Sequence, residues 1–385
     1  MRIAYVCADP GVPVFGCKGA SVHVQGVLGA FLRTGATVEL FAARMGAAAP
    51  ADLHAVVLHE IAAPPGRSAS DVHDREVALG QANDEFTRRI CAAGPFDLVY
   101  ERHALFAWAG MEVARDSAAV GILEVNAPLV QEQATHRKLV DRAGALKGVS
   151  RSFAAASAVL AVSSSLGELL EGSPDAQGKV HVIPNGVDRA RFGAPSPGIP
   201  DRPFTVAFVG TLKPWHGLDA LVDAFVLLRR AVPDARLLVI GDGPGRATLE
   251  RRLGEAGLQH AARLTGAVDP ARVGPLLAQA DASVAPYPAT AERYFSPLKV
   301  LESMAAGVPV VGSRVGQLPD LIRDGETGML CEAGDPHAVA LALAELASDA
   351  NRRLQMGARA RAWVLVHHSW DGVASRILDL AAVAA

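Results

Sequence analysis

Short runs of aliphatic and β-branched residues alternate with longer amphipathic stretches through nearly the whole chain. This alternation is typical of βαβ units, in which parallel strands are joined by helices that cover the sheet. It is interrupted once, at residues 191–203, where the sequence RFGAPSPGIPDRP contains too much Pro and Gly for regular structure. The pattern therefore predicts an α/β protein with two parallel-sheet domains, one on each side of a linker.

Each half of the chain has its own series of predicted strands, and its 385 residues are enough for two separate cores. The strands predicted before the linker are Ile3–Cys7, Val38–Phe41, Leu98–Tyr100, Ile122–Val125, Val159–Val162 and Val180–Ile183. Helices such as Ser21–Leu32 and Asp74–Ala92 are predicted between them. The strands predicted after the linker are Phe204–Val209, Arg236–Ile240, Arg263–Thr265, Ala282–Ala285 and Val308–Val311. From Pro336 the pattern is helical nearly to the end.

Composition and charge argue against several classes of protein. The formal net charge of −3 is unlike that of a nucleic-acid binder, which would have a basic excess. No run of 18 apolar residues is present, and the N-terminus lacks the apolar core of a secretory signal. The four cysteines have neither a zinc spacing nor a CxxC spacing. We therefore expect a reduced, cytoplasmic protein, and peripheral contact with a membrane stays open.

The loop after the first predicted strand is a candidate ligand site, because open parallel sheets bind ligands outside the carboxyl ends of their strands. Residues 10–19 read PGVPVFGCKG and precede a helix. Gly16 and Gly19 allow close backbone approach, and Lys18 with the helix N-terminus favours an anion. The segment lacks the GxGxxG spacing of dinucleotide sites, and an ordinary βα loop is the alternative interpretation.

A similar loop opens the second half of the chain. Residues 208–217 read FVGTLKPWHG, in which Gly210 directly follows the predicted strand Phe204–Val209. Lys213 lies before the next helix and is suited to pair with a phosphate. Taken alone, a lysine at such a position is more often solvated at the surface.

Residues 294–311, YFSPLKVLESMAAGVPVV, are the strongest candidate site. Pro297 suits the first turn of a helix, because its missing N–H would have no partner there. The free N–H groups of that turn can bind a diphosphate, and Lys299 adds positive charge. Glu302, a little over one turn further on, can accept hydrogen bonds from both hydroxyls of a ribose. For Glu302 alone, an exposed helical carboxylate is the alternative.

Several segments together resemble the retaining glycosyltransferases of family 4, which have the two-domain GT-B fold. The segment SPLKVLESMAAGVPVV at residues 296–311 is the most diagnostic of them. The others follow in the order of the family and are AVS at 161–163, IPNGVD at 183–188, FVG at 208–210, GDGP at 241–244 and LTGAV at 264–268. The resemblance extends over essentially the whole chain.

The resemblance implies a GT-B fold, with two facing Rossmann-like domains, a cleft between them and a C-terminal helix that crosses back to the first domain. It implies a retaining hexosyltransferase whose second domain holds a nucleotide-diphosphate sugar of the UDP or GDP type. The first domain would hold a hydroxyl acceptor from glycan, glycolipid or natural-product biosynthesis. No divalent metal and no further cofactor are expected, because helix N-termini and basic side chains stabilise the leaving diphosphate.

The resemblance also assigns expected roles to individual residues. Those expected to contact the donor are Gly16, Lys18, Gly19, Gly210, Thr211, Lys213, Gly243, Val268, Tyr294, Ser296, Pro297, Leu298, Lys299 and Glu302. Those expected to contact the acceptor, or to cap helices, follow two strands of the first domain and are Glu101, Arg102, Glu124 and Asn126. His103 is expected near the anomeric carbon of the donor sugar. With Lys213, Lys299 and Glu302 it forms the predicted catalytic set.

The chain departs from the family pattern at two places. The family has Glu, seven residues and a second Glu, but here the first position is Tyr294, and Glu292 lies two residues too early. The Arg and Lys that the family has near the start of the second domain are replaced by Thr211 and His216. We interpret the two lysines of the catalytic set as the replacement cations for the diphosphate.

The predicted domains are residues 1–190 for the acceptor and residues 204–366 for the donor. The linker is 191–203, and a terminal helix at about 367–385 returns to the first domain. Phosphorylases and sugar-nucleotide epimerases share the architecture, but no phosphorylase site is recognised and an epimerase would lack the SPLK…E segment. A non-catalytic sugar-nucleotide-binding protein, or a partner subunit of another transferase, is the alternative that the missing Glu favours. The sugar, the base, the acceptor and the oligomeric state stay open.

Overall fold

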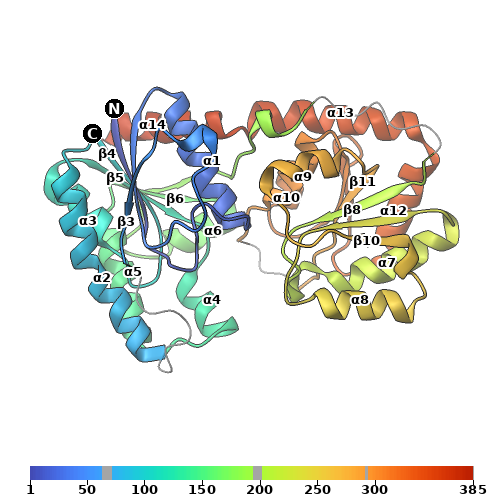
Figure 1. Cartoon of the computed structure of the whole chain (residues 1–385), viewed down its shortest axis with the longest axis horizontal. Helices are drawn as coiled ribbons and strands as arrows, with labels where there is room; N and C mark the ends of the chain where they lie inside the picture. Colours follow the sequence, from blue (N-terminus) through green and yellow to red (C-terminus); the bar gives the residue numbers. More distant parts are fainter. Residues whose placement is uncertain (63–71, 194–201, 291–293, 385) are drawn as a thin grey trace.

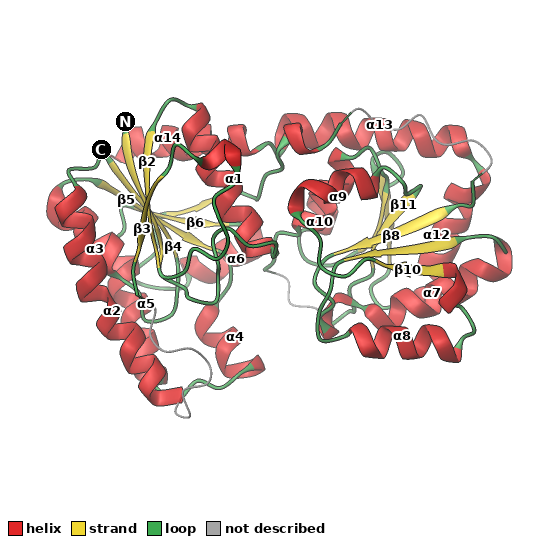
Figure 2. Cartoon of the chain, in the orientation of Figure 1, coloured by secondary structure: helices red, strands yellow, loops and turns green. Residues whose placement is uncertain are grey.

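The computed structural model describes residues 1–62, 72–193, 202–290 and 294–384. Within them the chain forms two parallel sheets, each covered by helices (Figure 1; Figure 2). The strand order is β3-β2-β1-β4-β5-β6-β7 in the first sheet and β10-β9-β8-β11-β12-β13 in the second. Both orders reverse direction after the third strand, as in Rossmann domains. The predicted α/β architecture with two Rossmann-like domains is confirmed.

The first sheet consists of β1 (Arg2–Cys7), β2 (Thr37–Ala42), β3 (Val57–Glu60), β4 (Leu98–Arg102), β5 (Val120–Val125), β6 (Ala158–Ala161) and β7 (Val180–Val182). The helices of this part are α1 (Gly19–Arg33), α2 (Val72–Ala93), α3 (Ala109–Ser117), α4 (Leu129–His136), α5 (Arg142–Ala155) and α6 (Ser164–Glu171). The predicted strands all form, and β3 is an additional edge strand.

The second sheet consists of β8 (Thr205–Val209), β9 (Arg236–Ile240), β10 (Ala262–Leu264), β11 (Ala282–Ala285), β12 (Val310–Ser313) and β13 (Gly328–Cys331). Its helices are α7 (Leu218–Ala231), α8 (Arg246–Glu255), α9 (Pro270–Leu277), α10 (Leu298–Ala305), α11 (Leu318–Leu321), α12 (Pro336–Ser348) and α13 (Ala350–His367). The last helix, α14 (Trp370–Ala384), follows α13 directly. The edge strand β13 is again additional to the predicted set.

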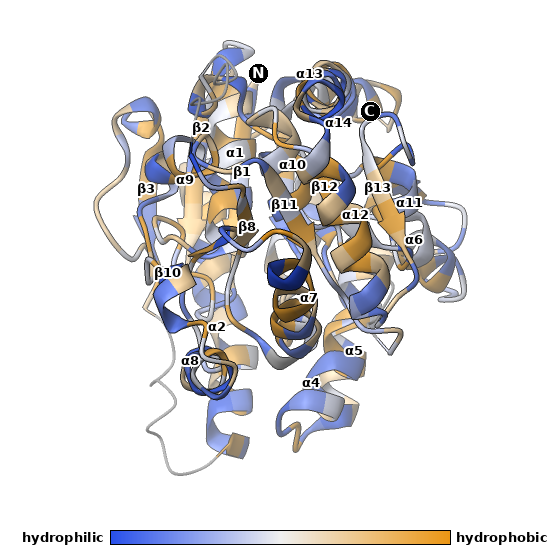
Figure 3. Ribbon diagram, turned by 90° about the vertical axis from the view of Figure 1, so that its right-hand side faces the viewer, coloured by the Kyte–Doolittle hydropathy of each residue, from blue (hydrophilic) through white to orange (hydrophobic). Residues whose placement is uncertain are grey.

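The central strands of both sheets are buried on both faces, which explains why they are almost continuously apolar. Residues 3–7 of β1, for example, are at most 1% exposed. Colouring by hydropathy shows hydrophobic strands at the centre of each domain and hydrophilic stretches on the outer helices (Figure 3).

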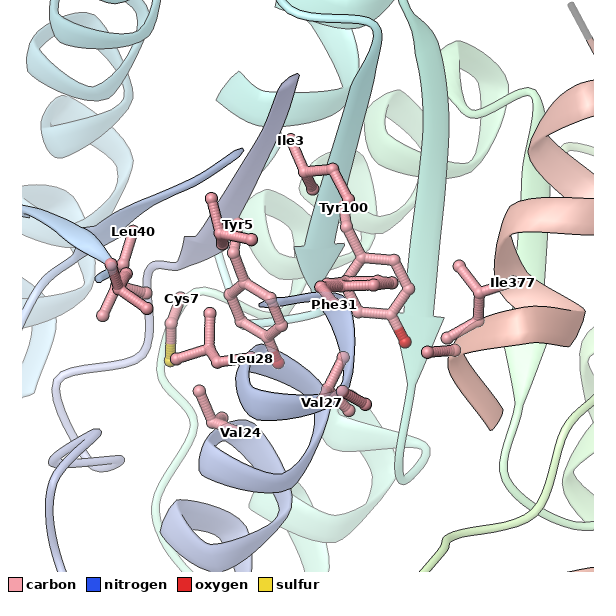
Figure 4. Close-up of a cluster of buried hydrophobic side chains, with 14 of the residues drawn as sticks. Ile3, Tyr5, Cys7, Val24, Val27, Leu28, Phe31, Leu40, Tyr100 and Ile377 are labelled. Carbon is pink, nitrogen blue, oxygen red and sulfur yellow. The ribbon is translucent and has the colours of Figure 1, made fainter. Parts of the chain in front are cut away.

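The C-terminal helix α14 leaves the second domain and packs on the first, as the GT-B prediction requires. Its Ile377 lies beside Phe31 of α1 and Tyr100 of β4 in the first core (Figure 4). Trp370, 2% exposed, lies against Gly26 of α1, where a Cβ atom would come within 2.3 Å of the indole nitrogen. Removing this apolar surface from water stabilises the folded protein by about 25 cal/mol per Å². The contact thereby holds the C-terminal helix against the N-terminal part of the chain.

Residues 194–201 of the predicted linker lie outside the described residues, as does Glu292. Among the helices that the structure describes, none has both the length and the apolar character needed to cross a membrane.

Candidate active site

The loops at the carboxyl ends of the two sheets meet each other. Strand order reverses between β1 and β4 in one sheet and between β8 and β11 in the other, and open parallel sheets bind ligands outside the strand ends at such a reversal. Gly19 begins α1, and a Cβ atom there would lie 3.9 Å from the Leu298 side chain at the start of α10. The Ser163 hydroxyl, after β6, donates to the Tyr294 carbonyl at 2.7 Å. Two helix N-termini, those of α1 and α10, therefore lie on either side of the boundary between the domains.

Lys299 occupies the first turn of α10 with its ammonium shielded from solvent. The Nζ atom lies 4.6 Å from the ring centroid of Phe208 and 5.0 Å from that of Tyr287. It has no hydrogen-bond partner among the described residues. Burial lowers the pKa of Lys299 from 10.5 to about 7. An ammonium held in this way is suited to receive an anion, because an anion restores both its charge and its missing hydrogen bonds.

Pro297 lies one residue before the helix, as the N-cap residue of α10, and not within its first turn. It is buried, and the neighbouring Ser296 bonds to the first domain. The Asn185 amide nitrogen donates to the Ser296 carbonyl at 2.9 Å, and its backbone N–H donates to the Ser296 hydroxyl at 3.3 Å. The Tyr294 side chain packs against the apolar core of the first domain. Residues 294–299 thus connect the two domains.

The loop after β8 adjoins Lys299. A Cβ atom on Gly210, whose φ is +136°, would lie 3.4 Å from the Lys299 Nζ atom. His216 Nδ1 lies 2.6 Å from the Thr211 carbonyl oxygen. Burial lowers the pKa of His216 to about 3, and the Lys299 charge adds to this effect. His216 is therefore neutral and does not supply the charge of the lysine that the family has at this place. Lys213 is half-buried in the same loop, with its Nζ atom 5.1 Å from the centroid of the Trp215 ring.

Glycines permit the close packing of the loops after β8 and β9. A Cβ atom on Gly241 would come within 2.1 Å of the Gly210 carbonyl oxygen, and one on Gly243 within 2.6 Å of the Leu212 nitrogen. Both glycines also have positive φ, +138° and +158°. The close packing of these two loops therefore requires glycine at both glycine positions of the GDGP turn. Val268, after β10, is half-buried against the apolar cluster that includes α10.

Glu302 lies on α10, nearly buried, close to the Arg191 guanidinium. Burial raises the pKa of Glu302, and Arg191 opposes that effect. Arg191 did not stand out in the sequence, because nothing in a Pro- and Gly-rich segment indicates where an arginine will fold.

A buried hydrogen-bond network surrounds Glu124 at the end of β5. Its carboxylate accepts from the Tyr100 hydroxyl at 2.5 Å, the Arg102 guanidinium at 3.0 Å and the Asn126 amide at 2.5 Å. His23 Nε2 of α1 lies 2.7 Å from the same carboxylate. Burial acts to raise the pKa of Glu124, but His23, Arg102 and Tyr100 outweigh it and lower the pKa to about 2. The carboxylate is ionised, and its partners fix its orientation.

Glu101 points to the opposite face of the sheet. Its carboxylate accepts from the Met111 N–H at 3.0 Å, at the N-terminus of α3. Burial raises the pKa of Glu101 to about 7. Two of the predicted acceptor contacts, Arg102 and Asn126, lie with Glu124 on the side of α1, and the fourth, Glu101, lies against α3.

His103 follows β4 and is 7% exposed. Its backbone N–H donates to the Glu124 carbonyl at 2.8 Å, and its ring lies 5.8 Å from that of Phe153. Burial lowers the pKa of His103 to about 4, with a further contribution from Arg102. The imidazole is neutral at physiological pH. In the loop after β1, Lys18 is the exposed N-cap residue of α1, and Gly16 packs against Ser21.

Two Rossmann-like domains whose strand ends face each other, with a last helix that returns to the first domain, define a GT-B architecture. Residues 18–191 match the family model described as Glycosyltransferase Family 4, and residues 203–349 match the one described as Glycosyl transferases group 1. The chain belongs to glycosyltransferase family 4.

Curated relatives are similar over different lengths. A GDP-mannose-dependent alpha-(1-6)-phosphatidylinositol monomannoside mannosyltransferase of Mycolicibacterium smegmatis is 33% identical over 211 residues, 51% of this chain and 55% of that protein. The chain thus matches little more than half the length of this relative. A D-inositol 3-phosphate glycosyltransferase of Salinispora tropica is 27% identical over 392 residues, 94% of this chain and 80% of that protein.

Solved structures share the fold over nearly the full length. A sucrose-phosphate synthase from Thermosynechococcus elongatus superposes with a TM-score of 0.76 at 20% identity, covering 99% of this chain and 98% of that one. The Anabaena protein HepE, in complex with UDP and glucose, superposes with a TM-score of 0.72 at 18% identity, covering 98% of each chain. At such identities the likeness shows the fold.

Proposed function

We propose that this protein is a metal-independent, retaining glycosyltransferase that moves a hexose from a nucleotide-diphosphate sugar to a hydroxyl acceptor. The observation that carries the proposal is the Lys299 ammonium in the first turn of α10, buried and without a hydrogen-bond partner among the described residues. A buried cation without a partner is costly, and a diphosphate at the adjacent helix N-terminus would compensate that cost.

In the reaction, the bond between the sugar C1 and the β-phosphate oxygen breaks, and its electron pair goes to the diphosphate. The acceptor oxygen bonds to C1 on the same face, and its proton passes to the departing phosphate. Lys299, Lys213 and the α10 N-terminus would stabilise the leaving charge. Glu302 would accept from the ribose hydroxyls. His103, neutral because of its burial, would lie near C1 and orient the sugar.

The relatives suggest which donors to test first. The Mycolicibacterium enzyme is named for GDP-mannose and the Salinispora enzyme for D-inositol 3-phosphate. HepE binds UDP and glucose. We infer that UDP and GDP sugars are the candidate donors, and that a polyol or glycolipid hydroxyl is the candidate acceptor.

A thermal-shift screen against UDP, GDP, ADP, dTDP and their sugars, without metal, tests the donor site. A ligand bound only by the folded state raises Tm by mass action. We expect one nucleoside diphosphate to stabilise the wild type and not the Lys299→Ala variant. If none of them stabilises the wild type, the proposed donor site is wrong.

Donor hydrolysis and transfer assays then separate catalysis from binding. We expect His103→Ala to retain nucleotide binding and to lose at least about tenfold in turnover, as removal of a positioned catalytic group does. Nucleotide binding without any hydrolysis or transfer would favour the alternative of a non-catalytic binding protein, which the tyrosine at position 294 suggests.

A further inference from the structure

The chain segment that enters the second domain is fixed in place before the linker. The Asp188 carboxylate accepts from the Ala190 N–H at 2.9 Å and caps a short 3-10 helix, Arg189–Arg191. Phe192 is 3% exposed within an apolar cluster of the second domain. A Cβ atom on Gly274 of α9 would lie 2.4 Å from the Arg191 carbonyl oxygen. The backbone of Arg191 therefore packs tightly on the second domain.

The Arg191 side chain lies between the two elements expected to hold a nucleoside. Its NH2 group donates to the Pro270 carbonyl at 2.6 Å, two residues after Val268. The same group lies 3.9 Å from Glu302 Oε1, and the side chains are 22% and 12% exposed. That separation is too long for a hydrogen bond, but it is close enough for electrostatic attraction in a poorly solvated place.

The Glu302 carboxylate accepts no hydrogen bond from any side chain or backbone group that the structure describes. Its oxygens therefore keep their lone pairs for a ligand. Without a nearby cation, burial would favour the protonated acid, which has lost most of its power to accept from two hydroxyls. Arg191 supplies that cation and is itself held by the Pro270 carbonyl.

We propose that Arg191 is a positioning residue that keeps Glu302 ionised and oriented to accept from the 2′- and 3′-hydroxyls of the donor ribose. This inference rests on the proposed function and adds a residue to its donor site. Arg191 acts without touching the nucleotide. The effect of its removal is confined to the ribose, and the diphosphate contacts at Lys299 are unchanged.

Calorimetry with UDP, GDP and their 2′-deoxy counterparts tests the assignment. A hydrogen bond to a charged group changes affinity by roughly tenfold or more, so we expect the wild type to bind the ribonucleotide about tenfold more tightly than the deoxynucleotide. Arg191→Gln keeps a donor for Pro270 but removes the charge, and should reduce this preference to about twofold or less. Arg191→Lys should restore part of it. Arg189→Gln, an exposed neighbour in the same 3-10 helix, should leave it unchanged.

The outcomes separate this inference from the proposed function. If neither UDP nor GDP binds the wild type, the proposed function fails. If the nucleotides bind and Arg191→Gln weakens ribo- and deoxynucleotides equally, the role of Arg191 is structural and the inference is wrong. Glu302→Gln provides a second variant should Arg191→Gln not fold. A Glu302→Gln protein that keeps the wild-type preference for the ribonucleotide overturns the inference as well.

Discussion

Replacing Lys299 with methionine should make the ligand-free protein more stable and remove its nucleotide site. The Lys299 ammonium is buried without a hydrogen-bond partner among the described residues, and burial lowers its pKa from 10.5 to about 7. Folding places the Lys299 amine where its neutral form is favoured. This costs free energy at every pH at which the lysine of the unfolded chain is protonated. Methionine fills similar space without a charge.

The magnitude follows from the pKa shift. A fall from 10.5 to about 7 costs about 4 kcal/mol of folding free energy at neutral pH, at roughly 1.36 kcal/mol per pKa unit. The cation–π contacts with Phe208 and Tyr287 return about 1 kcal/mol each. We therefore expect Lys299→Met to raise the free energy of unfolding by about 2 kcal/mol, which is a rise of several degrees in Tm.

The stability difference between Lys299→Met and the wild type depends on pH. The folded-state pKa of Lys299 lies below the unfolded-state value, so between about pH 7 and 10.5 the unfolded wild type binds more protons than the folded protein. Wild-type stability therefore rises with pH across this window, and the advantage of Lys299→Met shrinks toward zero near its upper end.

Thermal unfolding at neutral pH and at about pH 9.5, with and without UDP or GDP, measures these quantities. Lys147→Met, on the exposed face of α5, is the control and should differ from the wild type at neither pH. A Lys299→Met protein that is less stable than the wild type at neutral pH refutes the reasoning about burial. One that still binds nucleotide as tightly as the wild type refutes the assignment of the site.

Three further predictions concern Lys299, Glu124 and Gly26. Above about pH 7 the affinity for a nucleotide sugar should fall roughly tenfold per pH unit, because binding requires a protonated Lys299; calorimetry in buffers of different ionisation enthalpy should show uptake of about one proton. Glu124→Ala should lower the free energy of unfolding by about 3–5 kcal/mol in chemical denaturation, because it leaves Arg102 buried without its carboxylate. Gly26→Ala should cost about 1–3 kcal/mol and increase proteolysis of α14, because the new methyl group would displace Trp370.

The sequence was sufficient for the central strands of both sheets and for one edge strand of each, β7 and β10, but it missed the opposite edges, β3 and β13. Central strands such as β1 and β8 are continuous apolar runs because they are buried on both faces. The missed strand β3 reads VLHE, and both of its apolar side chains are more than 40% exposed. The missed strand β13 begins with Gly328. These two edge strands have little buried apolar character, so their pattern is too weak to recognise.

The candidate site could be predicted by segment but not by side-chain direction. Successive residues of a strand point to opposite faces of the sheet. The side chains of Glu101 and Arg102 therefore lie on opposite faces, although both residues are at the end of β4. His23 falls within the predicted helix Ser21–Leu32, where the sequence does not indicate a partner, yet it pairs with Glu124. One signal was present: His23 shares the apolar face of α1 with Val27 and Ala30, and a buried polar side chain there requires a partner.

The loss of the first family Glu is accompanied by a direct connection between the donor segment and the first domain. Ser163 bonds to the carbonyl of Tyr294, and Asn185 bonds to the carbonyl and hydroxyl of Ser296. These bonds fix the residues just before α10 from outside the second domain, so separation of the domains would break them. The segment that leads into α10 is therefore held in part by the first domain. Because coupling between two equilibria is reciprocal, a nucleotide that binds more tightly while these bonds are formed would in turn stabilise the contact between the domains. In this chain the place of the missing carboxylate is thus taken by a tyrosine whose carbonyl accepts from the first domain and whose side chain packs against it.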